Sequence, residues 1–220
     1  MRRLSLILIV TGVLVLLYPL LDRAYTWYWQ QKIFNEWEAE HMREDTHVEK
    51  DTVKERVETE AGLEENENNI NPAESSEAEG SENDTILRNT LGILEIEKIN
   101  LKLPILGGTS EAILRIGAGL LEGTAGIAEV GNTVLTAHRS HTYGRFFNRL
   151  DELEAGDRIT ISTEHDQQYH YVVYRTIIVE VDDTSIFEFE EGDRILTLYT
   201  CHPLYSVNPV NRLIVQARLE

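Results

Sequence analysis

The feature that most constrains the fold is a series of short apolar stretches between about residue 89 and residue 220. They are rich in β-branched residues, turn-forming residues separate them, and several alternate apolar with polar side chains. Seven or eight short strands at this spacing predict an all-β sandwich or barrel. Only Ser110–Leu114 and Arg145–Leu153 are expected to form short helical turns. The stretches are GILEIEKIN (92–100), LPIL (103–106), NTVLTAH (132–138), DRITIST (157–163), YHYVVYRTIIVEV (169–181), DRILTLYT (193–200) and NRLIVQARL (211–219).

Residues 1–29 are predicted to form a membrane anchor. Arg2 and Arg3 precede a run from Leu4 to Leu21 that contains no charged residue. A helix of this length extends roughly 27 Å, close to the thickness of the hydrocarbon core of a bilayer. Aromatic residues gather at the far end of the run, and the positive charge before it places the N-terminus inside. A cleaved signal peptide is the alternative, but the run is long for one and no clear cleavage site follows.

Residues 30–89 are predicted to be an acidic, largely disordered tether. Residues 30–60 carry scattered apolar side chains among many charges, without a sustained apolar face. Residues 60–84 are mostly Glu, Asn and Ser, so this segment cannot offset its ordering entropy by burial. The formal charge of the chain is −18, which makes a nucleic acid a poor partner because its phosphates are repelled. The globular domain is therefore expected over residues 90–220.

Three side chains at the ends of predicted strands are candidates for chemistry. Cys201 follows the strand Ile195–Thr200 and is the single cysteine of the chain. A reactive cysteine acts as a thiolate, and a neighbouring cation lowers the pKa of the thiol. His138 and Arg212 lie at the ends of two other strands and are able to provide that cation. Each also has an ordinary structural interpretation, because a strand-end cysteine can be buried and inert, and a histidine or arginine can simply be exposed.

A zinc site is the competing interpretation of these histidines. His138 and His141 have an H-x-x-H spacing, but zinc needs three or four converging ligands. Helical zinc motifs place the two histidines four residues apart, and no second cysteine is present. The sequence therefore predicts neither a metal nor a cofactor.

Three motifs carry a resemblance to a known family. TLYTCHP at 197–203 resembles the TLxTC motif of the sortases, and TAHR at 136–139 resembles their GHR segment. NRLIVQARL at 211–219 resembles the sortase strand that carries an arginine. The segments 92–125 and 146–161 also resemble sortase sequence, so the likeness covers nearly all of residues 92–219. One departure is Ala137, where the family commonly has glycine.

The resemblance implies a closed β-barrel of about eight strands and a cysteine transpeptidase. It implies that Cys201 attacks the Thr carbonyl of an LPxTG-like sorting signal in a secreted protein and forms a thioacyl enzyme. His138 would be the general acid and then the general base, and Arg212 would position the substrate and stabilise the oxyanion. The acceptor would be an amine, such as that of a peptidoglycan precursor. The predicted location is the cell membrane, with a single span and an extracytoplasmic catalytic domain.

The sequence also bears on the sortase subclass and leaves two other functions open. DDTSIFEF before the cysteine strand and the compact domain resemble class D sortases, whereas Tyr143 after the histidine and TCHP also resemble class E. We favour class D. The other functions are a cysteine protease, in which water accepts the acyl group, and a non-catalytic anchored barrel that binds a wall or protein ligand.

Overall fold

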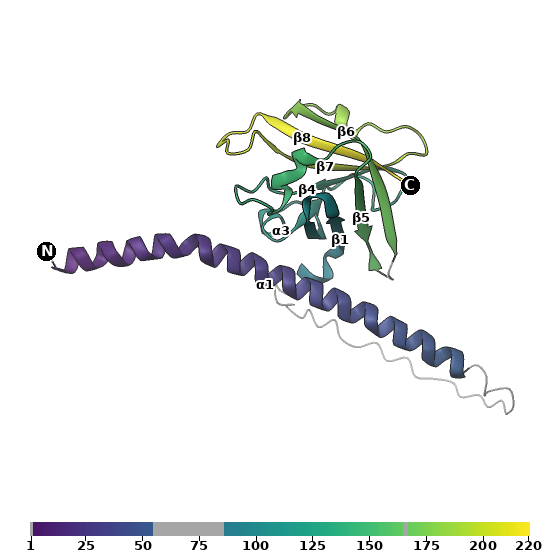
Figure 1. The fold of residues 1–220 in the computed structure, drawn as a ribbon, viewed down its shortest axis with the longest axis horizontal. Coiled ribbons are helices and arrows are strands. Elements are labelled where there is room, and N and C mark those ends of the chain that lie inside the picture. The colour runs from purple at the N-terminus through teal and green to yellow at the C-terminus, as the bar shows by residue number, and fades with distance from the viewer. Residues whose placement is uncertain (1, 55–85, 165–166) are drawn as a thin grey trace, which may run out of the picture.

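The computed structural model describes residues 2–54, 86–164 and 167–220, and a closed eight-stranded barrel follows one long helix. The strand order around the barrel is β1-β2-β3-β4-β7-β8-β6-β5, which confirms the predicted all-β class and closed barrel (Figure 1). The elements are α1 (Arg2–Lys54), β1 (Thr90–Ile96), η1 (Glu97–Ile99), β2 (Leu101–Gly107), α3 (Glu111–Leu114), β3 (Ala118–Leu120), β4 (Gly131–Thr136), η2 (Phe147–Glu152), β5 (Arg158–Ser162), β6 (Gln168–Glu180), η4 (Ser185–Phe187), β7 (Arg194–His202) and β8 (Asn211–Leu219).

Alternation along the strands builds the barrel interior. Leu196 and Leu198 of β7 and Leu213 and Val215 of β8 are buried in one main core cluster. Their sequence neighbours therefore face outward, because successive strand residues point to opposite sides of a sheet. The two short helical turns form close to the predicted places, as α3 and η2. Ser110 starts α3, and its hydroxyl accepts a hydrogen bond from the backbone of Ile113.

Two strand pairs are parallel, and one of them matters for the site. β4 runs parallel to β7, with Thr136 opposite Tyr199, whereas β8 pairs antiparallel with β7. The carboxyl ends of β4 and β7 therefore reach the same end of the barrel, and β8 begins there. This arrangement brings together the three strands that carry the predicted site residues.

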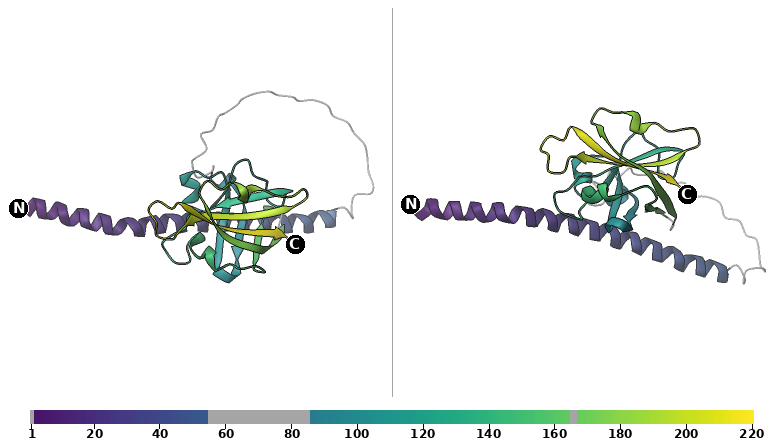
Figure 2. Two further views of the ribbon diagram at one scale, coloured as in Figure 1. Left: turned by 90° about the horizontal axis from the view of Figure 1, so that it is seen from above. Right: turned by 45° about the horizontal axis from the view of Figure 1, so that its top comes forward.

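The long helix α1 packs against the barrel, which the sequence-based domain boundaries did not predict. Figures 1 and 2 show α1 passing along one side of the barrel and extending beyond it in both directions. Trp29 and Ile33 are 4% and 2% exposed, and they form a second apolar cluster with Ile93, Leu106 and Ile116.

The boundary expected at residue 29, between the anchor and the tether, falls inside α1. Helix α1 continues to Lys54, and Gln30 Nε2 donates a 2.8 Å hydrogen bond to the Ile116 carbonyl. The physical reason is an apolar stripe at positions 29, 33 and 37 that continues across the predicted boundary. The tether prediction for residues 60–84 lies outside the described residues. Within the described part of the chain, no helix qualifies by length and hydropathy as a membrane span.

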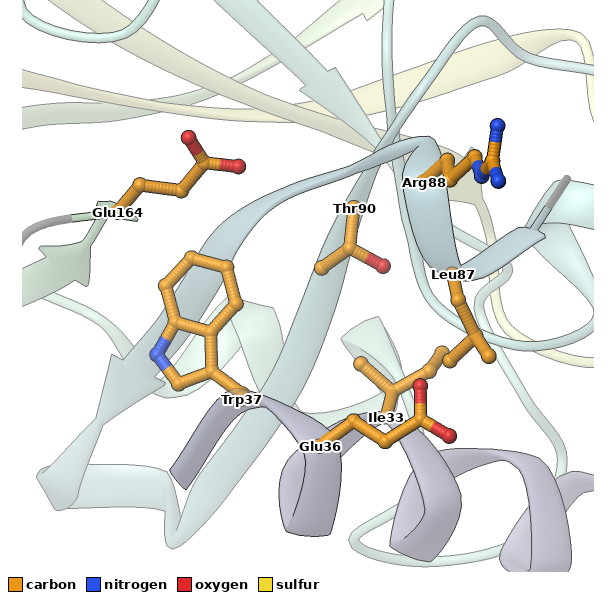
Figure 3. Close-up of a pocket in the computed structure, with 7 residues that line it drawn as sticks. All are labelled: Ile33, Glu36, Trp37, Leu87, Arg88, Thr90 and Glu164. Atoms are coloured by element: carbon orange, nitrogen blue, oxygen red, sulfur yellow. The ribbon is translucent and has the colours of Figure 1, made fainter. Parts of the chain in front are cut away.

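A pocket of about 570 Å³ lies between α1 and the barrel (Figure 3). None of the three predicted site residues lines it, so it lies apart from the candidate chemistry. Figure 3 shows Ile33 and Trp37 of α1 facing the segment that leads into β1, with the carboxylate of Glu164 at one side. The lining residues are Ile33, Glu36, Trp37, Leu87, Arg88, Thr90 and Glu164.

Candidate active site

Cys201 and Arg212 are direct neighbours across the β7–β8 pair. The register places Cys201 opposite Arg212, and paired residues of adjacent strands project from the same face of a sheet. That face is the outer one, because Leu213 points into the core. Cys201 is a free, half-buried thiol. It lies within β7, whereas the sequence predicted that it follows the strand.

His138 reaches the same place from β4. Thr200 Oγ1 donates a 2.7 Å hydrogen bond to the Ala137 carbonyl, which extends the β4–β7 pairing by one residue beyond Thr136. His138 is therefore level with Cys201 and, by alternation from the buried Ala137, faces outward as well. The ring of Phe146 meets the His138 ring edge to face, with centroids 6.3 Å apart. The structure thus gathers all three predicted site residues on one outer face at one end of the barrel.

Arg212 is held by three hydrogen bonds that leave part of its guanidinium free. Nε donates to the Tyr199 hydroxyl at 2.8 Å, and Nη1 donates to the carbonyls of Pro209 and Asn211 at 2.9 Å each. Nη2 makes no hydrogen bond with any residue that the structure describes. A guanidinium fixed in this way presents a charged donor beside Cys201 at little further entropic cost. Sequence reasoning missed Tyr199, although alternation within TLYTC places it on the face of Cys201.

His138 lies in an environment that favours its neutral form. Its side chain keeps an exposed edge, yet desolvation by the surrounding protein lowers the pKa of the ring below its ordinary value. The negative charge of Glu111 opposes this effect, and the positive charges of Arg145 and Arg115 add to it. A neutral imidazole is the form that accepts a proton.

We expect an NMR titration of His138, in a Cys201→Ala background that removes coupling to the thiol, to show a pKa below 6.5. Arg145→Gln should raise that pKa, because it removes a positive charge that disfavours the imidazolium. Glu111→Gln should lower it further, and the distant Arg158→Gln should leave it unchanged. A His138 pKa at or above the ordinary value would contradict the desolvation.

A second pair of residues ties the histidine segment to the cysteine strand. Arg139 Nη1 lies 2.7 Å from His202 Nδ1, and Arg139 Nη2 lies 2.9 Å from an Asp151 carboxylate oxygen. A guanidinium only donates, so His202 Nδ1 accepts and its proton is on Nε2. The Arg139 side chain is 4% exposed. Because Arg139 follows His138 and His202 follows Cys201, this link fixes the relative position of the two candidate residues.

The sortase domain model matches residues 94–220. The chain belongs to the sortase family. Sortase D of Bacillus subtilis is 37% identical over 128 residues, which are 58% of this chain and 62% of that protein. This likeness agrees with the resemblance to class D.

Solved structures of sortases share the fold. Sortase C1 from Streptococcus agalactiae has a TM-score of 0.55 and 35% identity, over 61% of this chain and 69% of that one. A sortase C from Clostridium perfringens, solved with the C-terminal cell wall sorting motif, has a TM-score of 0.53 and 34% identity over 60% and 70%. The chain spans less than two thirds of the length of the curated relatives, 62% for Sortase D and 53% for Sortase A of Bacillus anthracis.

Proposed function

We propose that this protein is a cysteine transpeptidase that cleaves an LPxTG-like sorting signal after the threonine and transfers the acyl part to an amine. The observation that carries the proposal is the common outer face of Cys201, His138 and Arg212 at one barrel end. A thiol, an imidazole and a guanidinium so arranged provide a nucleophile, a proton carrier and a fixed positive charge. The solved sortase C with a sorting motif supports the choice of substrate.

In this mechanism neutral His138 takes the proton of the Cys201 thiol, and the resulting thiolate attacks the threonine carbonyl. Arg212 stabilises the oxyanion through the free Nη2, while its other nitrogens stay bonded to protein groups. His138 gives a proton to the leaving amine, and the C–N bond breaks to leave a thioacyl enzyme. An incoming amine then attacks the thioacyl carbon, His138 takes its proton, and the C–S bond breaks.

The test is incubation of the full-length protein, in mild detergent, with LPxTG, LPxTA and LAxTG peptides and an amine. Mass spectrometry should find a thioacyl adduct on Cys201 and an amide product, and Cys201→Ala should give neither. Acid product without amide would favour the cysteine protease. A folded protein that forms no adduct, and whose Cys201 resists a general thiol reagent, would favour the non-catalytic barrel.

We also propose that residues 1–29 anchor the protein in the cell membrane with the barrel outside. The support is the uncharged run from Leu4 to Leu21, with arginines before it and aromatic residues after it. The protein is then expected to sediment with membranes and to resist alkaline extraction. Deleting residues 4–21 should move it to the soluble fraction, whereas deleting residues 60–84 should not. A full-length protein found entirely in the soluble fraction would refute the anchor.

A further inference from the structure

A second pocket, of about 320 Å³, opens directly beside His138. Its walls come from three places, which are α1, α3 and the segment that follows β4. Neither Cys201 nor Arg212 is among the residues that line it, and β7 and β8 contribute no lining residue. The lining residues are Asp22, Glu111, Arg115, His138, Arg139, Ser140, His141, Arg145 and Phe146.

Most charged groups of this pocket already have partners. Arg145 Nη1 lies 3.4 Å from an Asp22 carboxylate oxygen, and Arg145 Nη2 donates to Thr26 Oγ1 at 2.5 Å. Arg139 is held by Asp151 and His202 as described above. These pairs build the wall and are not available to a ligand without a loss of contacts.

The two remaining charged side chains of the pocket come from α3, Glu111 in its first turn and Arg115 at its C-cap. Glu111 and Arg115 are exposed, and neither side chain makes a hydrogen bond or ion pair with a residue that the structure describes. Glu111 raises the pKa of His138 and Arg115 lowers it, so both charges act on that ring. The pocket therefore offers one free carboxylate and one free guanidinium next to the proposed proton carrier.

We propose that this pocket binds the amine acceptor, and that the acceptor is amino-acid-like, with a carboxylate close to the reacting amine. Glu111 would hold the ammonium form of the amine, and Arg115 would hold the carboxylate. The inference rests on the proposed transpeptidation, because only a thioacyl enzyme needs such an acceptor. The position fits that step, since the acceptor must approach His138 while the acyl chain occupies the Cys201 side.

The bound ammonium first loses one proton to water, and the neutral amine nitrogen attacks the thioacyl carbon. The C–S bond then breaks, its electron pair goes to the sulfur of Cys201, and the second amine proton passes to His138. The products are an amide, a Cys201 thiolate and a His138 imidazolium, so no oxidant or other co-reactant is required.

The test measures how the thioacyl enzyme divides between amide and acid product, using a peptide that the full-length wild type cleaves. Glycine and glycinamide serve as acceptors, because they share the amine and differ in the carboxylate. Glu111→Gln should lower the amide-to-acid ratio about two- to fivefold for both acceptors, as expected for one exposed charge pair. Arg115→Gln should lower it for glycine only, and the control Glu97→Gln, on the exposed η1 turn, should change neither.

The possible failures are distinguishable. A wild type that forms no thioacyl enzyme refutes the proposed function itself. An equal fall of amide and acid formation in Glu111→Gln would mean that Glu111 acts only through His138, which overturns the acceptor site. An Arg115→Gln variant that affects both acceptors equally would overturn the amino-acid-like acceptor.

Discussion

Replacing Arg212 with lysine is expected to slow thioacyl formation at Cys201 about 100- to 1,000-fold, the usual effect of losing an oxyanion donor. Arg212 uses Nε and Nη1 for Tyr199 and two backbone carbonyls, which leaves Nη2 without a hydrogen bond to any described residue. A lysine has a single ammonium, so it cannot keep these bonds and face the oxyanion as well. Single-turnover mass spectrometry of the adduct measures the rate.

Two variants act as controls for this result. Arg218→Lys changes an exposed arginine on the same strand and should keep the wild-type rate. Tyr199→Phe removes only the Nε partner of Arg212, so its rate should fall less than that of Arg212→Lys. If Arg212→Lys acylates within a few-fold of the wild type while the barrel stays folded, Arg212 is not the oxyanion donor.

Replacing Trp29 with alanine is expected to release α1 from the barrel at a cost of about 3–5 kcal/mol, typical for a buried tryptophan. Trp29 is 4% exposed and packs with Ile93, Leu106 and Ile116, all of which would lose an apolar cover. The main barrel core includes none of these four residues, so the barrel should stay folded. Limited proteolysis should then cut α1 faster, and thermal unfolding should begin at a lower temperature.

The matched control is Trp27→Ala, two residues away on α1. Trp27 is 64% exposed, so its loss should leave proteolysis and thermal unfolding close to the wild type. Equal behaviour of the two variants would show that α1 does not depend on this contact. Release of α1 would also free Arg145 from Asp22 and Thr26, which removes one wall of the pocket beside His138.

The barrel could be predicted because the sequence signals for each of its strands are local. Each strand is a short β-branched run bounded by turn residues, and Leu196 and Leu198 show the alternation that buries one face. The candidate residues could be predicted because motifs place Cys201, His138 and Arg212 at strand ends. No local signal shows which strands are neighbours. That expectation came only from the resemblance to the sortases.

Two features were missed for different reasons. The docking of α1 had a local signal, since Trp29, Ile33 and Trp37 recur every four residues, but a boundary at residue 29 divided that stripe. The link between Arg139 and His202 had no local signal. It depends on the parallel register of β4 and β7, which the sequence does not reveal.

That parallel register also affects how the protein folds. Thr200 and Ala137, whose hydrogen bond sets His138 level with Cys201, are 63 residues apart in the chain. Contacts of such high sequence separation are costly in loop entropy and form slowly. His138 therefore reaches the level of Cys201 only when β4 has paired with β7, whereas Arg212 joins Cys201 through the neighbouring strand β8.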